Sequence, residues 1–153
     1  MTFNDLLKNK TRWIDLREIS EYEHNSLRIT ISVQKSGKEE LTKLCGTEFM
    51  SDPVIDDENE PLIVIDFPNY INCSIQDEVF CRVDEAEEYE GNSFRIYTKS
   101  KFMDYVGVGT DWRNDEKAVR HYCLCCCWSV INVASSYEPN VYVIGRPKHG
   151  NSE

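Results

Sequence analysis

The chain has 153 residues, the length of one domain with its own hydrophobic core. Hydrophobic residues make up 41% of it and aromatic residues 11%, which excludes an intrinsically disordered chain. Its formal net charge is −10, and this disfavours direct binding to nucleic acid or anionic membranes, because both are themselves negatively charged. A basic protein is the natural partner of so acidic a chain.

The cysteine content and the hydropathy pattern predict a location. The first ten residues lack the apolar stretch of a secretion signal, and no apolar run approaches the roughly 20 residues of a membrane span. The seven cysteines are odd in number, and Cys125–Cys127 are consecutive. Neighbouring residues on a strand point to opposite faces, so local disulfides there are awkward. We expect free thiols in a reducing cytoplasm and no membrane association.

The first half of the chain predicts one short helix and one clear strand. Thr2 can cap a helix that buries Phe3, Leu6 and Leu7. Apolar and polar residues alternate over 27–34, which is typical of a half-exposed strand, whereas residues 12–19 fit a strand or a helical turn. The other elements expected here are a turn over 35–38, a short helical turn over 39–44 that Gly46 ends, and a loop over 51–61.

The second half predicts more strands. Residues 62–67 form a buried strand that Pro68 ends, and residues 71–83 alternate with an irregularity at Asp77 and with Phe80 on the polar parity. Residues 122–134 are apolar on both parities, which is typical of a central strand covered on both faces. The remaining elements are strands over 94–97 and 141–144, a helix that Ser100 caps and that buries Phe102, Tyr105 and Val106, and a short helix over 111–119.

Together these elements predict an α+β fold. We expect a single domain over residues 1–145, with a mixed or mainly antiparallel sheet of about six or seven strands and a few short helices. Strands that come in runs, rather than alternating with long helices, favour antiparallel pairing. Residues 146–153 are expected to form a loose polar tail.

The acidity is concentrated in one block. Residues 52–90 contain 13 acidic residues and one basic residue, Arg82, a net charge of −12, whereas the rest of the chain has a net charge of +2. Solvated loops tolerate such charge runs at little cost, so the block alone does not require a function. Its functional interpretation is an interface for a basic surface, with Tyr89 and Trp112 as aromatic anchors. The residues of this candidate interface are Asp56, Asp57, Glu58, Glu60, Asp84, Glu85, Glu87, Glu88, Tyr89, Glu90 and Trp112.

A second hypothesis is an enzyme or metal site at His121 and the Cys123–Cys127 run. The spacing of these cysteines does not fit the paired knuckles of a structural zinc site, and an apolar strand should raise thiol pKa values rather than activate a nucleophile. Small buried hydrophobic residues are the simpler interpretation of the run. We therefore expect no catalytic residue, no metal and no cofactor.

Two segments resemble a known class of proteins. Glu88–Val106 and His121–Val133, the latter followed by Glu138 and Pro139, resemble small bacterial toxin-immunity proteins, including partners of contact-dependent growth-inhibition toxins. The resemblance implies a cytoplasmic protein that binds a cognate toxin domain, often a basic nuclease, one to one and blocks its active site. An interaction module unrelated to toxins is the remaining alternative.

Overall fold

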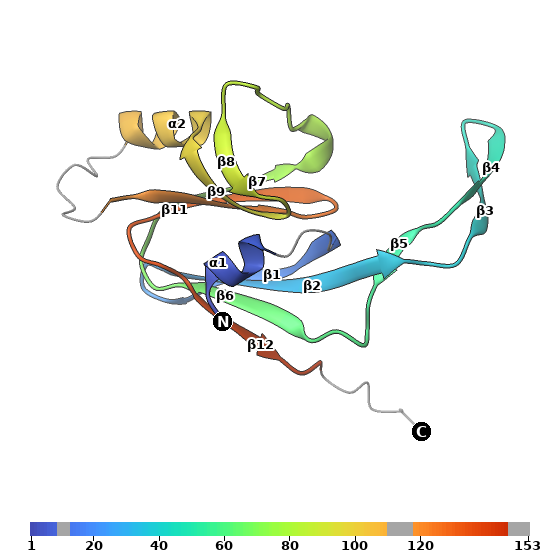
Figure 1. Ribbon diagram of the computed structural model, residues 1–153, viewed down its shortest axis with the longest axis horizontal. Coiled ribbons are helices and arrows are strands. Elements are labelled where there is room, and N and C mark those ends of the chain that lie inside the picture. The colour runs from blue at the N-terminus through green and yellow to red at the C-terminus, as the bar shows by residue number, and fades with distance from the viewer. Residues whose placement is uncertain (9–12, 110–117, 147–153) are drawn as a thin grey trace.

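The computed structural model describes residues 1–8, 13–109 and 118–146, and its two main sheets pack face to face (Figure 1). The first sheet has the order β1-β2-β6-β12, and β5 pairs with the end of β2. All of its pairings are antiparallel. Its strands are β1 (Trp13–Glu23), β2 (Ser26–Ser36), β5 (Val54–Asp56), β6 (Leu62–Phe67) and β12 (Asn140–Ile144).

The second sheet has the order β7-β11-β10-β9-β8 and is also antiparallel throughout. A 3₁₀ turn, η1 (Glu78–Phe80), follows β7, and helix α2 (Lys101–Gly109) follows β9 and lies over the outer face of this sheet. The strands of this sheet are β7 (Tyr70–Asp77), β8 (Glu88–Gly91), β9 (Phe94–Lys99), β10 (Arg120–Cys125) and β11 (Ser129–Ser135).

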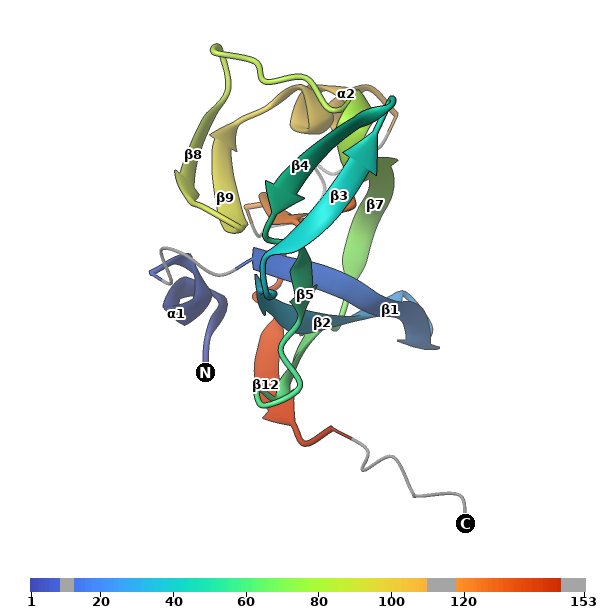
Figure 2. The same cartoon turned by 90° about the vertical axis from the view of Figure 1, so that its right-hand side faces the viewer.

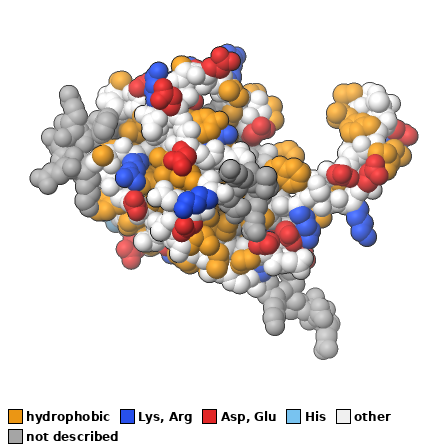
Figure 3. Space-filling view, in the orientation of Figure 1, with side chains coloured by type: hydrophobic (Ala, Val, Ile, Leu, Met, Phe, Trp, Pro, Cys, Tyr) orange, Lys and Arg blue, Asp and Glu red, His pale blue; other side chains and the backbone are white. Residues whose placement is uncertain are grey.

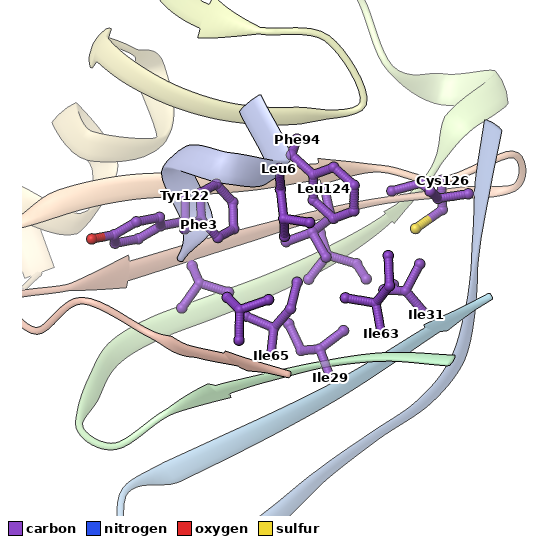
Figure 4. Close-up of a cluster of buried hydrophobic side chains, with 14 of the residues drawn as sticks. Phe3, Leu6, Ile29, Ile31, Ile63, Ile65, Phe94, Tyr122, Leu124 and Cys126 are labelled. Carbon is purple, nitrogen blue, oxygen red and sulfur yellow. The ribbon is translucent and has the colours of Figure 1, made fainter. Parts of the chain in front are cut away.

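The core lies between the two sheets and is closed at one side by helix α1 (Phe3–Leu7). Alternation along each strand sends every second side chain inward, so Ile29 and Ile31 of β2 face Tyr122 and Leu124 of β10 across the interior (Figure 4). Thr2 caps α1, as the sequence predicts, and the Asp5 side chain completes a reciprocal capping box. Phe3 packs edge-on against Tyr122 at 4.9 Å.

The predicted fold is confirmed in its coarse features. The described chain is predominantly antiparallel β with two small α-helices, although its strands form two sheets and a separate hairpin rather than one sheet. Residues 12–19, ambiguous in sequence, lie in β1 from Trp13 onward. Among the described residues, no helix has the length and apolarity to cross a membrane. The expected helix over 111–119 falls mostly outside the described residues.

One segment predicted as a helical turn forms a projecting arm. Residues 39–44 contribute strand β3 (Glu40–Leu44), whose one partner among the described strands is β4 (Thr47–Ser51). Cys45 and Gly46 have φ values of 50° and 81°, the left-handed pair of a two-residue hairpin turn, so Gly46 makes a turn rather than a helix end. The arm extends away from both sheets (Figures 1 and 2) and carries exposed hydrophobic side chains (Figure 3).

Residues 122–134 are not one strand but most of a hairpin. Strands β10 and β11 pair with each other, and Cys126–Trp128 form the turn, closed by a 2.8 Å bond from Cys126 N–H to Ser129 O. Both strands are central in their sheet, with the core on one face and α2 on the other, so both parities are apolar. The 71–83 stretch likewise divides at Asp77, which caps η1.

Candidate functional site

A cavity of about 530 Å³ opens on the outer face of the second sheet. Outward-facing side chains of β7, β9, β10 and β11 form its floor, and α2 and residues 78–87 form its walls. His121 and Cys125 alternate with Tyr122 and Leu124 on β10, which is why the first pair reaches the cavity and the second pair the core.

His121 lies in the cavity floor and is held on both ring nitrogens. Nε2 donates to Asn132 Oδ1 at 2.8 Å, so Nδ1 accepts from the Ser100 hydroxyl, also at 2.8 Å. Tyr97 stacks on the ring at 4.4 Å. Burial lowers the pKa of His121 to about 4, against a smaller opposing effect of the Asn132 hydrogen bond. His121 thus links the start of α2 to β11 as a neutral side chain.

Arg95 is the half-buried cation of the cavity. Its Nε donates to Asn92 O at 2.7 Å, its Nη1 donates to Tyr97 Oη at 3.3 Å, and its guanidinium lies 4.2 Å from the Tyr89 ring centroid. Within the described part of the chain, no carboxylate lies at ion-pairing distance from it. Its guanidinium is therefore held in place by neutral oxygens and an aromatic ring, not by a counter-charge.

The cysteine thiols differ in burial and in neighbouring charge, and therefore in pKa. All seven lie in described segments and are free. Burial raises the pKa of Cys73 to about 11 and that of Cys126 to about 12, as expected for an apolar strand. Cys125 is an exception to that expectation. A hydrogen bond from Cys123 and the charge of Arg95 lower the pKa of the Cys125 thiol, although its burial and Glu78 oppose the shift.

The structure separates the two acidic clusters predicted as one interface. Asp56, Asp57, Glu58 and Glu60 lie at and after β5, at the edge of the first sheet, whereas Asp84–Glu90 lie on β8, the edge strand of the second sheet, and in the loop before it (Figure 1). Asp56 binds Arg17 and Arg146, and Asp57 binds Lys35. Cations of the same chain thus neutralise much of the first cluster.

The second cluster is more open. Asp84 pairs with Lys101, and Glu87 accepts a 2.9 Å hydrogen bond from the Lys101 backbone N–H at the start of α2. No cation of the described chain lies at ion-pairing distance from the three exposed carboxylates of this cluster, those of Glu85, Glu88 and Glu90. Tyr89 lies among them on β8, 47% exposed. Trp112 falls outside the described residues.

Exposed apolar side chains flank this second cluster, and the predicted interface did not include them. Val79, Phe80 and Val83 are 74%, 73% and 96% exposed, and Val83 also lines the cavity. Phe80 on the polar parity of its stretch was the available sequence signal. Tyr105, expected in the core, is 68% exposed and lines the cavity, because the short α2 buries only Val106 fully. We call residues 78–90, with their apolar and acidic side chains, the acidic segment.

The arrangement at His121 and the cysteine run does not assemble a metal-ligand set. Among residues 1–8, 13–109 and 118–146, no three side chains of His, Cys, Asp or Glu lie grouped so as to hold a metal ion. Other residues of the cavity floor, Arg95, Tyr97 and Asn132, were not singled out from the sequence. The available sequence signal for Asn132 is its polarity within an otherwise apolar run. In comparisons with known proteins, no family model, no curated protein and no solved structure matches this chain.

Proposed function

We propose that this protein is an immunity-type inhibitor: a non-enzymatic, cytoplasmic binding protein that neutralises a cognate basic toxin domain, such as a nuclease, in a 1:1 complex. The observation that carries the proposal is the composition of the acidic segment. It places large exposed apolar side chains at the mouth of a cavity, beside carboxylates with which no cation of residues 1–8, 13–109 and 118–146 forms an ion pair.

The apolar side chains would supply the affinity. Phe80 and Val83 are each more than two thirds exposed, and a protein surface rarely leaves several neighbouring large apolar residues in water without a partner. A buried apolar centre with a polar rim is the common anatomy of a protein interface. The same segment also holds the rim, since Glu85, Glu88 and Glu90 are exposed.

The carboxylates would supply selectivity for a basic partner. Three acidic side chains that form no ion pair within the described part of the chain project a negative potential, which speeds the association of a positive surface and repels nucleic acid. A nuclease domain carries a positive surface because it must bind a phosphate backbone. An acidic inhibitor that covers this surface would block access of the substrate.

The proposal is tested by mixing the protein with a basic nuclease domain encoded next to it and measuring affinity and nuclease activity. We expect a 1:1 complex with loss of nuclease activity. The triple substitution Glu85→Lys, Glu88→Lys and Glu90→Lys should weaken binding and its salt dependence, and Phe80→Ser with Val83→Ser should weaken binding by about tenfold or more. The matched control is Glu18→Lys, Glu23→Lys and Glu39→Lys, which changes the net charge equally on other exposed positions.

If both sets of variants inhibit the nuclease as well as the unmodified protein, the acidic segment is not the interface. If a pull-down from the native host instead captures a basic protein without toxic activity, and the acidic-segment variants abolish that capture, the protein is an interaction module of another kind. That outcome overturns the immunity assignment while keeping the interface.

A further inference from the structure

Strand β10 presents two thiols on the same face. Cys123 and Cys125 are two residues apart, so both point to the outer side of the sheet, and their sulfur atoms lie 3.9 Å apart. Cys125 lines the cavity and is partly exposed, whereas Cys123 is buried behind it. A small molecule that enters the cavity can therefore reach the Cys125 thiol, and the Cys123 thiol lies close enough to react with Cys125.

A cation lies next to this pair. Arg95 is opposite Cys123 in the register of β9 and β10, and its charge favours the ionised form of Cys125. The hydrogen bond from the Cys123 thiol acts in the same direction. Because no carboxylate of the described chain neutralises Arg95, its positive charge is available to the sulfur.

The other thiols lack this combination. Cys126 lies in the hydrophobic core, and burial and the charge of Asp15 raise the pKa of Cys127. Cys81 lines the same cavity, but its pKa is raised by burial and by the charges of Cys125, Glu78 and Asp77, and its Sγ lies 3.5 Å from the Asp77 carbonyl oxygen. Cys125 is the thiol whose cavity position, neighbouring thiol and neighbouring cation coincide.

We propose that Cys123 and Cys125 form a redox-active dithiol, in which a peroxide that enters the cavity oxidises Cys125 and Cys123 then closes a disulfide with it. In the first step the Cys125 thiolate attacks one peroxide oxygen. An S–O bond forms, the O–O bond breaks, and hydroxide leaves and takes up a proton as water. In the second step the Cys123 sulfur, after losing its proton, attacks the Cys125 sulfur and displaces the hydroxyl group as a second water.

The backbone sets the character of this disulfide. Two residues along a strand lie roughly 6.6–6.8 Å apart at Cα, which is the upper end of the span that disulfides bridge. A Cys123–Cys125 disulfide is therefore possible but strains the backbone of β10, and a strained disulfide is readily reduced. We expect this disulfide to form and be reduced reversibly, rather than to be a permanent structural disulfide.

The test is oxidation of the purified full chain with hydrogen peroxide, followed by mass mapping of the peptide that contains both residues. We expect loss of two hydrogens from the Cys123–Cys125 pair, reversed by dithiothreitol. In Cys123→Ser the sulfenic acid of Cys125 should persist and react with dimedone. Arg95→Gln should slow alkylation of Cys125 at pH 7 severalfold, because it removes the charge that favours the thiolate. Cys127→Ser is the control and should oxidise like the unmodified protein.

The proposal is overturned if the oxidised bond maps to other cysteines, or if Cys125 is alkylated no faster than Cys127 in the native protein. It is also overturned if dimedone labelling of Cys123→Ser does not exceed that of the Cys123→Ser, Cys125→Ser double variant. A folded state equal to that of the unmodified protein, checked by circular dichroism, is part of each comparison. None of these readouts uses the toxin, so the result is independent of the proposed immunity function.

Discussion

Arg146 and Asp56, which lie 90 positions apart in the chain, are joined by two parallel hydrogen bonds of 2.5 and 2.9 Å between guanidinium and carboxylate. Arg146 also donates to Glu60 O at 2.7 Å. The residue that the sequence places at the start of a loose tail is therefore bound to β5 of the first sheet and to the loop that follows β5. The same contact converts an acid of the predicted interface into a structural ion pair.

Loss of this pair should destabilise the fold. Asp56→Asn leaves two arginines without their carboxylate, and we expect a loss of about 2 kcal/mol in the free energy of unfolding. Urea denaturation at pH 7 measures it, with the exposed Glu58→Gln as a control of equal charge change and an expected loss below about 0.5 kcal/mol. Equal stabilities of the two variants would show that Asp56 is as solvated as Glu58.

Burial of neutral His121 should make the fold sensitive to mild acid. Its pKa is about 4 in the folded protein against 6.5 for the free side chain, so between these values the unfolded chain binds a proton that the folded chain does not. Neutral His121 therefore makes its full contribution to the free energy of unfolding above pH 6.5. This contribution falls by about 3 kcal/mol as the pH drops to 4. Asp56, Asp57 and Asp84, whose pKa values are lowered from 3.8, lose their contributions only below that value.

The measurement is urea denaturation at a series of pH values between 7 and 4. His121→Gln should be less stable at pH 7, since it disturbs the bonds to Ser100 and Asn132, but its stability should change less across this range. If the unmodified protein and His121→Gln show the same slope, His121 is not the group that titrates.

Gly91 should resist substitution. Its φ is +101°, and a Cβ at this position would lie 2.0 Å from the Phe94 carbonyl oxygen and 2.9 Å from Leu7 Cδ2. Gly91→Ala must move the β8–β9 turn, and we expect a loss of about 3 kcal/mol in the free energy of unfolding. Gly46→Ala, with φ of +81° and no atom within 4 Å of a Cβ, carries only the backbone penalty of about 1 kcal/mol. Similar losses for both would contradict the steric argument.

The β3–β4 arm should be dispensable for folding. Every arm side chain except those of Thr42 and Ser51 is exposed, and the 2.6 Å bond from Gly37 N–H to Pro53 O brings the two ends of the arm together. Replacing residues 38–52 with Asn-Gly should leave the free energy of unfolding within about 1 kcal/mol of that of the full chain. Urea denaturation and circular dichroism measure this. An unfolded product would show that the arm belongs to the folding unit.

The sequence predicted those features that depend on neighbours along the chain. The alternation in 27–34 and the apolar run in 62–67 placed strands correctly, and Thr2 and Ser100 marked two helix starts, because side-chain periodicity and capping act over a few residues. It also showed the concentration of acidic residues over 52–90, but not the exposed apolar residues Val79, Phe80 and Val83 beside them. It missed the β10–β11 turn, since Cys126–Trp128 contains neither glycine nor proline, and it read the Cys45-Gly46 turn as a helix end.

Only the tertiary structure decided which side chains and charges become neighbours of those residues in space. Arg146 neutralises Asp56 across 90 positions, while no cation of the described residues pairs with Glu85, Glu88 or Glu90, so two clusters alike in sequence differ in charge environment. Cys125 differs from Cys126 because strand and turn direct one thiol to a cavity beside Arg95 and the other to the core. Electrostatic and packing energies depend on distance in space, and chain composition fixes which charges exist but not which of them become neighbours.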